Sequence, residues 1–270
     1  MSNIVSSKNF NAYCGRYSRK AKHRTPERKI GWYIEDNLLE KIPVLALRNR
    51  RIDERNDLPF SWRRNRDLTQ AIDLTLNTLK AWQAFRPANS DKIIKKLRSD
   101  LPQMIMKFEE RIRRYNVRKV WSIRNLDQVD YNSVLEIVSK IVGEISNYKT
   151  ERYPMLGSKV MHFLFPEIFP VWDTAWIKNE CLNNEDEPHK QWLPAEVVAT
   201  LHNYNSAAAE YASYFALMLR DLDLVGQKAY KKVEKAFVTY SEIPKDVIFY
   251  HFYDMSPIVF EFCLLGKHIR

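Results

Sequence analysis

The chain is poor in glycine and in cysteine, and it has no long run of apolar residues. Its 270 residues include six glycines, which leaves little material for the tight hairpin turns of a β-sheet protein. The three cysteines, Cys14, Cys181 and Cys263, are odd in number and far apart, so they indicate neither a disulfide framework nor a clustered iron–sulfur or zinc site. This cysteine usage indicates a reducing compartment, and we expect the protein to be cytoplasmic.

The sequence also shows neither a signal peptide nor a membrane-spanning segment. The first twenty residues lack the apolar centre of a signal peptide, and no stretch offers the roughly eighteen uninterrupted apolar residues of a membrane span. Apolar residues make up 45% of the chain and aromatic residues 13%, which is ample for a packed interior. We therefore expect a soluble folded protein with no membrane partner.

What the chain does have is an excess of positive charge. It carries 43 lysines and arginines against 33 acidic residues, a net charge of +10, which favours a polyanionic partner because each neutralised phosphate releases counterions. Residues 1–30 hold eight of the cations and the single acid Glu27; they either track a phosphate backbone or form a solvated terminus. We expect residues 1–65 to form a basic N-terminal segment with a helix, followed by a helical core over 66–270.

Helical periodicity recurs along the chain and predicts an all-α fold. Between residues 67 and 85, apolar residues recur at steps of three and four, which is typical of an amphipathic helix. After Pro87, Ser90 is placed as the cap of a helix through Leu97. Further helices are expected at 104–115, 131–148, 193–203, 205–223, 227–240 and 244–265. No persistent alternation of period two and no internal repeat indicates a sheet or a repeat protein.

The segment from Tyr153 to Asp173 is the most informative about function. It follows the apolar helix 131–148 and begins another helix, so it is interpreted as helix, hairpin at 149–159, helix. A glycine in the turn, Gly157, permits a positive φ and the close approach of a phosphate. The free N–H groups at the start of the next helix can bind an anion. This arrangement predicts a grip on a DNA backbone.

The segment resembles the helix-hairpin-helix superfamily of DNA glycosylases, most closely the 8-oxoguanine DNA glycosylase-like branch. The residues on matching hairpin positions are Pro154, Leu156, Gly157 and Lys159. The run Phe169-Pro170-Val171-Trp172-Asp173 is similar to the family's aspartate segment. The resemblance covers about 45 residues, from Val129 to Asp173. Met155 departs from the usual glycine, and the spacing from Lys159 to Asp173 is shorter than usual, so the second helix must end near Phe165-Pro166.

The resemblance implies a base-excision enzyme that acts on double-stranded DNA carrying a damaged or modified base, without metal or cofactor. Asp173 would be the catalytic carboxylate, and Lys159 would be the nucleophile of an enzyme that also has abasic-site lyase activity. The DNA-contacting residues would be Leu156, Gly157, Ser158, Lys149 and Arg152. An aromatic base pocket is expected from Trp172, Trp176, Phe252 and Tyr253.

Each of these residues also has a purely structural interpretation. Asp173 precedes Thr174 and is a natural helix N-cap, and Lys159 could be a phosphate contact or a surface lysine. The four aromatic residues could equally belong to the core. His162, beside an apolar run, is interpreted as a core histidine rather than a general base.

Two other classes of function compete with the glycosylase. One is a non-catalytic helix-hairpin-helix DNA-binding protein of a prokaryotic repair or antiviral defence system, which needs the basic hairpin but not the carboxylate. The other is a protein-interaction or nucleotide-sensing helical domain, in which the positive charge is incidental. The oligomeric state is left open by the sequence.

Overall fold

Every regular element that the structure describes is helical. The computed structural model describes residues 3–13, 65–81, 84–85, 90–149, 153–173, 177–178, 193–240 and 255–268. A short helix over residues 7–13 precedes α4 (Asn65–Ala81), α5 (Ser90–Arg113), α6 (Val120–Ile123), α7 (Gln128–Ser146), α8 (Met155–Leu164), α10 (Ala195–Tyr204), α11 (Ser206–Tyr240) and α13 (Ser256–Lys267). The all-α prediction is confirmed for this part of the chain. The finer expectation of a glycosylase-like arrangement stays a prediction.

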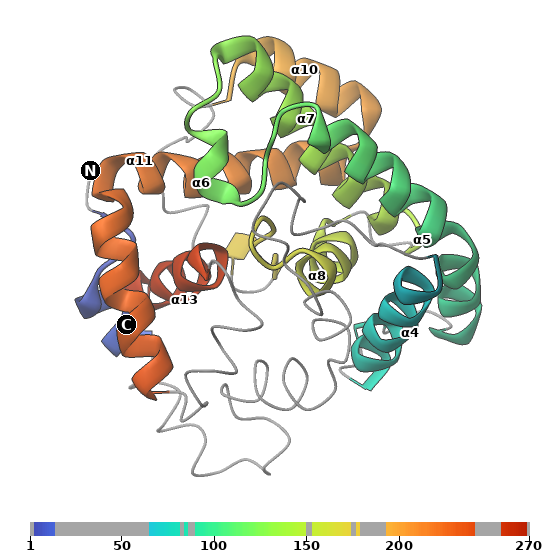
Figure 1. Cartoon of the computed structure of the whole chain (residues 1–270), viewed down its shortest axis with the longest axis horizontal. Helices are drawn as coiled ribbons and strands as arrows, with labels where there is room; N and C mark the ends of the chain where they lie inside the picture. The colour runs from blue at the N-terminus through green and yellow to red at the C-terminus, as the bar shows by residue number, and fades with distance from the viewer. Residues whose placement is uncertain are drawn as a thin grey trace.

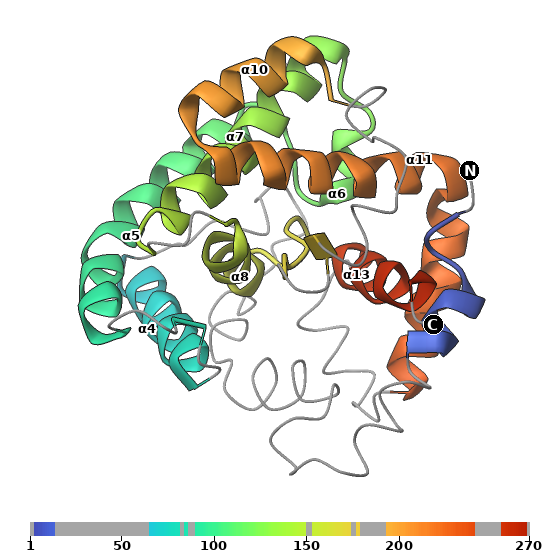
Figure 2. The same ribbon diagram turned by 180° about the vertical axis from the view of Figure 1, so that it is seen from behind.

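The helices are arranged around a central pair, α7 and α11 (Figure 1). On one side α5 lies along α7, and α4 packs against both α5 and α8. On the other side α13 packs against α11, while α10 covers the outer side of the central pair (Figure 2). The short helix α8 therefore lies in the middle of the molecule, between the α4–α5 side and the α13 side. None of the helices in the described ranges is both long and apolar enough to cross a membrane.

Two of the expected helix boundaries differ from the structure. The helices predicted on either side of residue 100 are one continuous helix, α5, and Ser90 is its first residue rather than its cap. The reason is an unbroken buried stripe, Ile94, Leu97, Leu101 and Ile105, whose burial outweighs the missing N–H of a proline at position 102. The two helices expected at 205–223 and 227–240 lie end to end in α11, separated by a kink where Gly226 has a φ of 71°.

The first residues of the chain belong to the core. The backbone N–H groups of Ile4 and Val5 donate to the carboxylate of Asp221 in α11 at 2.7 and 3.1 Å. The hydroxyl of Tyr230 donates to the same carboxylate at 3.0 Å. We call these four residues the N-terminal clamp. Residues 14–64, which hold most of the predicted basic segment, lie outside the described residues. The expected domain boundary between residues 65 and 66 falls at the start of α4 and stays a prediction.

Candidate active site

Helix α8 begins where the sequence predicted a hairpin turn, and this corrects the interpretation of Gly157. Gly157 is the third residue of α8 and is not among the described residues with positive φ. A Cβ at this position would lie 2.0 Å from the carbonyl oxygen of Val142 in α7. The N–H of Gly157 donates to the Ser146 hydroxyl at 3.1 Å. Glycine is therefore required because two helices touch here, and its N–H is already occupied by the protein.

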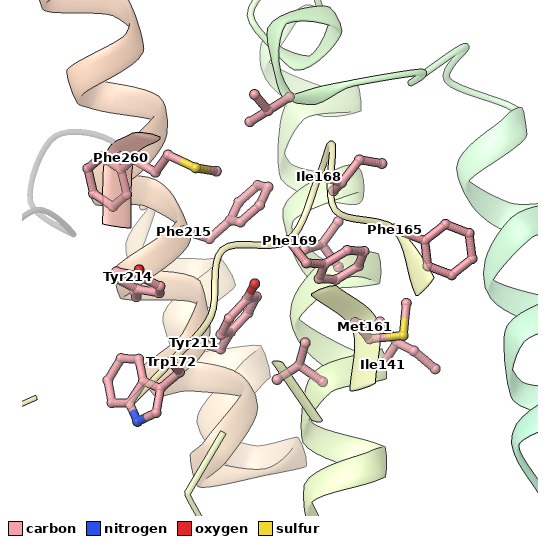
Figure 3. Close-up of a cluster of buried hydrophobic side chains, with 14 of the residues drawn as sticks. Ile141, Met161, Phe165, Ile168, Phe169, Trp172, Tyr211, Tyr214, Phe215 and Phe260 are labelled. Atoms are coloured by element: carbon pink, nitrogen blue, oxygen red, sulfur yellow. The ribbon is translucent and has the colours of Figure 1, made fainter. Parts of the chain in front are cut away.

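Helix α8 ends at Leu164, and Phe165 is its C-cap residue. This confirms the expectation that the second helix is short. The chain then runs back through the core as an irregular segment, and its side chains fill the space between α7 and α11 (Figure 3). Phe165 lies 5.2 Å from the Phe108 ring of α5, and Phe169 stacks at 6.4 Å on Tyr211 of α11. The aromatic packing anchors the segment before it reaches Asp173.

Side chains from neighbouring helices satisfy the carbonyl groups of this segment. The carbonyl oxygen of Phe169 lies 2.6 Å from Nδ1 of His162, so Nδ1 carries the proton and donates. The Tyr211 hydroxyl donates to the carbonyl oxygen of Pro170 at 2.9 Å. Burial lowers the pKa of His162 to about 4, against the opposing effect of the Phe169 carbonyl. His162 is thus a neutral core histidine, as the sequence suggested.

The N–H groups of the same segment are held in the same way. The N–H of Val171 is hydrogen-bonded to the carboxyl of Glu261 in α13, and the N–H of Trp172 donates to the Ser158 hydroxyl at 3.0 Å. An irregular buried backbone needs such partners, since an unsatisfied buried N–H is costly. Together with the two carbonyl contacts, they fix the backbone that leads directly into Asp173.

Most of the segment from 153 to 173 is buried, and its exposed members are few. Residues that keep a partly or fully exposed side chain are Tyr153, Met155, Lys159 and Asp173. Lys159 lies on α8 and Asp173 at the end of the irregular segment, and the charge of Asp173 raises the pKa of Lys159. The two residues that the resemblance named as catalytic are therefore close enough for the charge of one to act on the other.

The ammonium group of Lys159 is in an environment that favours its neutral form. Burial lowers the pKa of Lys159, Asp173 and Glu261 raise it, and Lys149 lowers it again, with a net decrease. A lysine with a lowered pKa is a better nucleophile at neutral pH, since more of it is the free amine. The interpretation of Lys159 as an ordinary surface lysine is not what the structure shows.

The remaining predicted site residues are mostly buried or outside the described ranges. Leu156 and Ser158 are buried, and Lys149 is 4% exposed, so the structure gives these three no open DNA-facing surface. Trp172 is 1% exposed and meets Tyr214 edge-on at 5.5 Å, which favours its interpretation as a core residue. Arg152, Trp176, Phe252 and Tyr253 lie outside the described residues.

The interpretation of Asp173 as a helix cap involves contacts between its carboxylate and the residues that follow it. The carbonyl oxygen of Asp173 accepts hydrogen bonds from Ile177 at 2.8 Å and from Lys178 at 3.3 Å. Residues 174–176, which a capping carboxylate would contact, lie outside the described residues.

Sequence reasoning missed one ionisable residue of this site, Glu261. It interacts electrostatically with both Lys159 and Asp173, although it lies in the last helix. The sequence does contain one local indication. Glu261 is the single acid in the mostly apolar helix Ser256–Lys267, and burying a charged carboxylate in such a helix is costly unless it is paired. No three His, Cys, Asp or Glu side chains of the described residues are grouped as a metal site requires.

Comparison with known proteins gives no relative for this chain: no family model, no curated protein and no solved structure matches it.

Proposed function

We propose that this protein binds DNA and cleaves the N-glycosidic bond of a damaged or modified base. The observation that carries the proposal is the pairing of Lys159 and Asp173. Both are partly exposed in a segment whose other members, apart from Tyr153 and Met155, are buried, and burial of the ammonium group lowers the pKa of the lysine. An ionisable group with a perturbed pKa and a specific charged neighbour is typical of catalytic sites. The excess of positive charge over the whole chain supports a polyanionic substrate.

The two side chains have complementary roles in such a reaction. When the bond from C1′ to the base nitrogen breaks, positive charge develops on the sugar, and the carboxylate of Asp173 stabilises it. The free amine of Lys159 then attacks C1′, and the sugar ring opens to a Schiff base that permits strand cleavage. If water attacks in place of the amine, the products are the free base and an abasic site.

The test is base release from a panel of duplexes that carry single modified bases. Asp173→Asn is expected to lower the rate of release by about 10³-fold, since it removes the charge that opposes the developing cation. Lys159→Gln is expected to abolish the adduct that borohydride traps. Asp223→Asn, a change at an exposed aspartate paired with Arg124, is the matched control and should behave as wild type. Release that is unchanged in Asp173→Asn contradicts the proposal.

A non-catalytic DNA-binding protein is the second candidate, and a groove between α5 and α7 favours it. The groove has a volume of about 460 Å³, and its charged lining residues are Lys107, Glu110, Arg111, Arg114, Lys140 and Glu144. Its cations outnumber its acids, which suits a phosphate backbone. On this view a double change of Lys107 and Arg111 to Ala weakens DNA binding and lowers its salt dependence, whereas Asp173→Asn leaves both binding and biological effect intact.

A further inference from the structure

The groove between α5 and α7 has an apolar floor. The two helices lie side by side (Figure 1), and the volume of the groove, about 460 Å³, is in the range of sites that bind small molecules, roughly 300 to 1,000 Å³. The apolar residues that line it, which we call the floor, are Met104, Phe108, Ile137 and Ile141. The ring of Phe108 also lies 5.2 Å from the ring of Phe165, so the core holds the floor in place.

Two of the four cations that line the groove are left for a ligand. Lys140 and Arg114 each pair with a glutamate four residues earlier, at 2.9 and 3.1 Å. The side chains of Lys107 and Arg111 form no ion pair or hydrogen bond with any of the described residues. Both are exposed, and because they are four residues apart on α5, they are neighbours on one face of the helix. The groove therefore offers two adjacent positive charges.

These two charges match a phosphate monoester better than a phosphate of the DNA backbone. A monoester carries close to two negative charges at neutral pH, because its second pKa is about 6, whereas each phosphate of a DNA strand carries one. Hydrogen bonds from lysine or arginine to phosphate are strong, since both partners are charged. Lys107 and Arg111 together can thus hold a terminal phosphate.

The floor requires a ligand that is larger than phosphate. Covering apolar surface with an apolar group is favourable, and phosphate alone has no such group. A duplex cannot supply one either, because its bases are stacked inside and it presents sugar and phosphate to a cavity of this size. A planar base attached to a single phosphate group meets both conditions.

A hydrogen-bond acceptor, Glu144, lines the groove at its other end. The hydroxyl of Tyr148 on α7 donates to Asp100 on α5 at 2.5 Å. Glu144 is one turn before Tyr148, which places it at the Met104 end of the groove. Tyr204 already donates to the carboxylate of Glu144, but a carboxylate has about four acceptor positions. Glu144 can therefore also accept from a hydroxyl or amino group of a ligand.

We infer that the groove binds a nucleoside 5′-monophosphate. Lys107 and Arg111 hold the phosphate, the base lies on the floor, and hydroxyl or amino groups of the nucleoside reach Glu144. Neither Lys159 nor Asp173 lines the groove, so this site does not depend on the cleavage of a glycosidic bond. Duplex DNA, considered above for the same groove, is a competing occupant that the experiment distinguishes.

A pair of double variants in α5 tests the two cations. Lys107→Ala with Arg111→Ala removes both of them. The matched control is Lys95→Ala with Arg113→Ala, which removes the same two residue types from the same helix, at exposed positions that do not line the groove. Alanine is compatible with a helix, and thermal unfolding without ligand reports whether both double variants are folded.

The measurement is calorimetric titration with AMP, GMP, CMP and UMP, and the wild type is expected to bind at least one of them. Lys107→Ala with Arg111→Ala should weaken this binding by about 10²-fold, because charge-assisted hydrogen bonds from two side chains are lost. The control should bind within about twofold of the wild type, since it removes only exposed charges. The cyclic 3′,5′-phosphate of the same nucleoside, a diester, and inorganic phosphate should each bind at least about tenfold more weakly.

Each outcome decides the assignment of the groove. If none of the four monophosphates binds, or if both double variants bind as the wild type does, the nucleotide site is overturned. Equal binding of the cyclic phosphate overturns the match to a monoester. Binding of a DNA duplex alone, weakened by Lys107→Ala with Arg111→Ala, assigns the groove to a DNA backbone instead. Base release is tested at Asp173, so the proposed function and the nucleotide site can fail separately.

Discussion

The N-terminal clamp and the candidate active site each contain a buried carboxyl group, and the two groups differ in how completely they are bonded. Asp221 accepts three hydrogen bonds, from Ile4, Val5 and Tyr230. Glu261 accepts one, from Val171, and has an oxygen with no partner among the described residues. Burial raises the pKa of both. The carboxyl of the clamp is thus fully bonded by the protein, whereas the carboxyl near Lys159 and Asp173 keeps a buried oxygen that has no hydrogen-bond partner among the described residues.

The contacts that hold the two regions in place also differ. The clamp joins the start of the chain to α11, and Tyr13 reinforces it by stacking at 4.6 Å on Phe262 of α13. The site is held instead through the backbone of residues 169–173, by contacts from α8, α11 and α13. Substitutions in the clamp should therefore change the free energy of unfolding alone, whereas substitutions around the site should change both the free energy of unfolding and the rate of base release.

The largest effect is expected from Gly157→Ala. The added Cβ would lie 2.0 Å from the carbonyl oxygen of Val142, and a backbone group cannot move aside, so we expect a loss of about 5 kcal/mol in the free energy of unfolding. Base release should fall with it, because α8 carries Lys159. Gly226→Ala is the control: no atom lies within 4 Å of its Cβ, and only its backbone conformation, a φ of 71° with a ψ of 166°, opposes the change, at about 1 to 3 kcal/mol. Equal losses in urea denaturation contradict the close helix contact.

The next effect is expected from Asp221→Ala in the clamp. It leaves the N–H groups of Ile4 and Val5 buried without an acceptor, at about 2 kcal/mol each, so the free energy of unfolding should decrease by about 4 kcal/mol. The control is Asp223→Ala, because this exposed aspartate has an ion pair with Arg124 that contributes less than about 1 kcal/mol. Urea denaturation measures both. If Asp221→Ala protein is still folded but has lost base release, the clamp does not act on stability alone.

A smaller effect is expected from the titration of His162, which supports the site. The unfolded chain protonates this imidazole below its ordinary pKa of 6.5, and the folded chain only below about 4. The stabilisation is thus complete above pH 6.5 and decreases as the pH falls towards 4, by about 3 kcal/mol at most. His162→Asn, which can still donate to the Phe169 carbonyl, should lose this pH dependence. If the free energy of unfolding of the wild type and of His162→Asn depends on pH in the same way between about pH 4 and 6.5, His162 is not a buried neutral histidine.

Predictions from the sequence succeeded where the information was local. The helical period of residues 67–85 predicted α4, and the run Phe165-Pro166 predicted where α8 ends. Both depend on neighbours three or four residues away, which the sequence displays directly. The juxtaposition of Lys159 and Asp173 was expected only through the resemblance, and their catalytic roles stay predictions.

Predictions were wrong or missing where a contact joins distant segments. Gly157 was interpreted as a turn residue because a glycine before a helix is typical of a turn, but its position is decided by the carbonyl of Val142 on another helix. Glu261 was not connected with the site, because nothing near it in the sequence resembles a reaction centre. The position of a helix in space depends on packing, and single-sequence periodicity says only which face is buried.

The sequence by itself determined that this chain is helical, which residues face inward, and that one short helix carries a lysine upstream of an aspartate, because these properties follow from local periodicity and capping. Only the tertiary structure decided that the irregular segment after α8 is threaded between α7 and α11 and that its backbone is held by side chains from three helices. It also decided that a glutamate of α13 lies close enough to that lysine and aspartate for their charges to act on it. Burial and electrostatic coupling depend on three-dimensional distance, and that distance is set by how the helices pack.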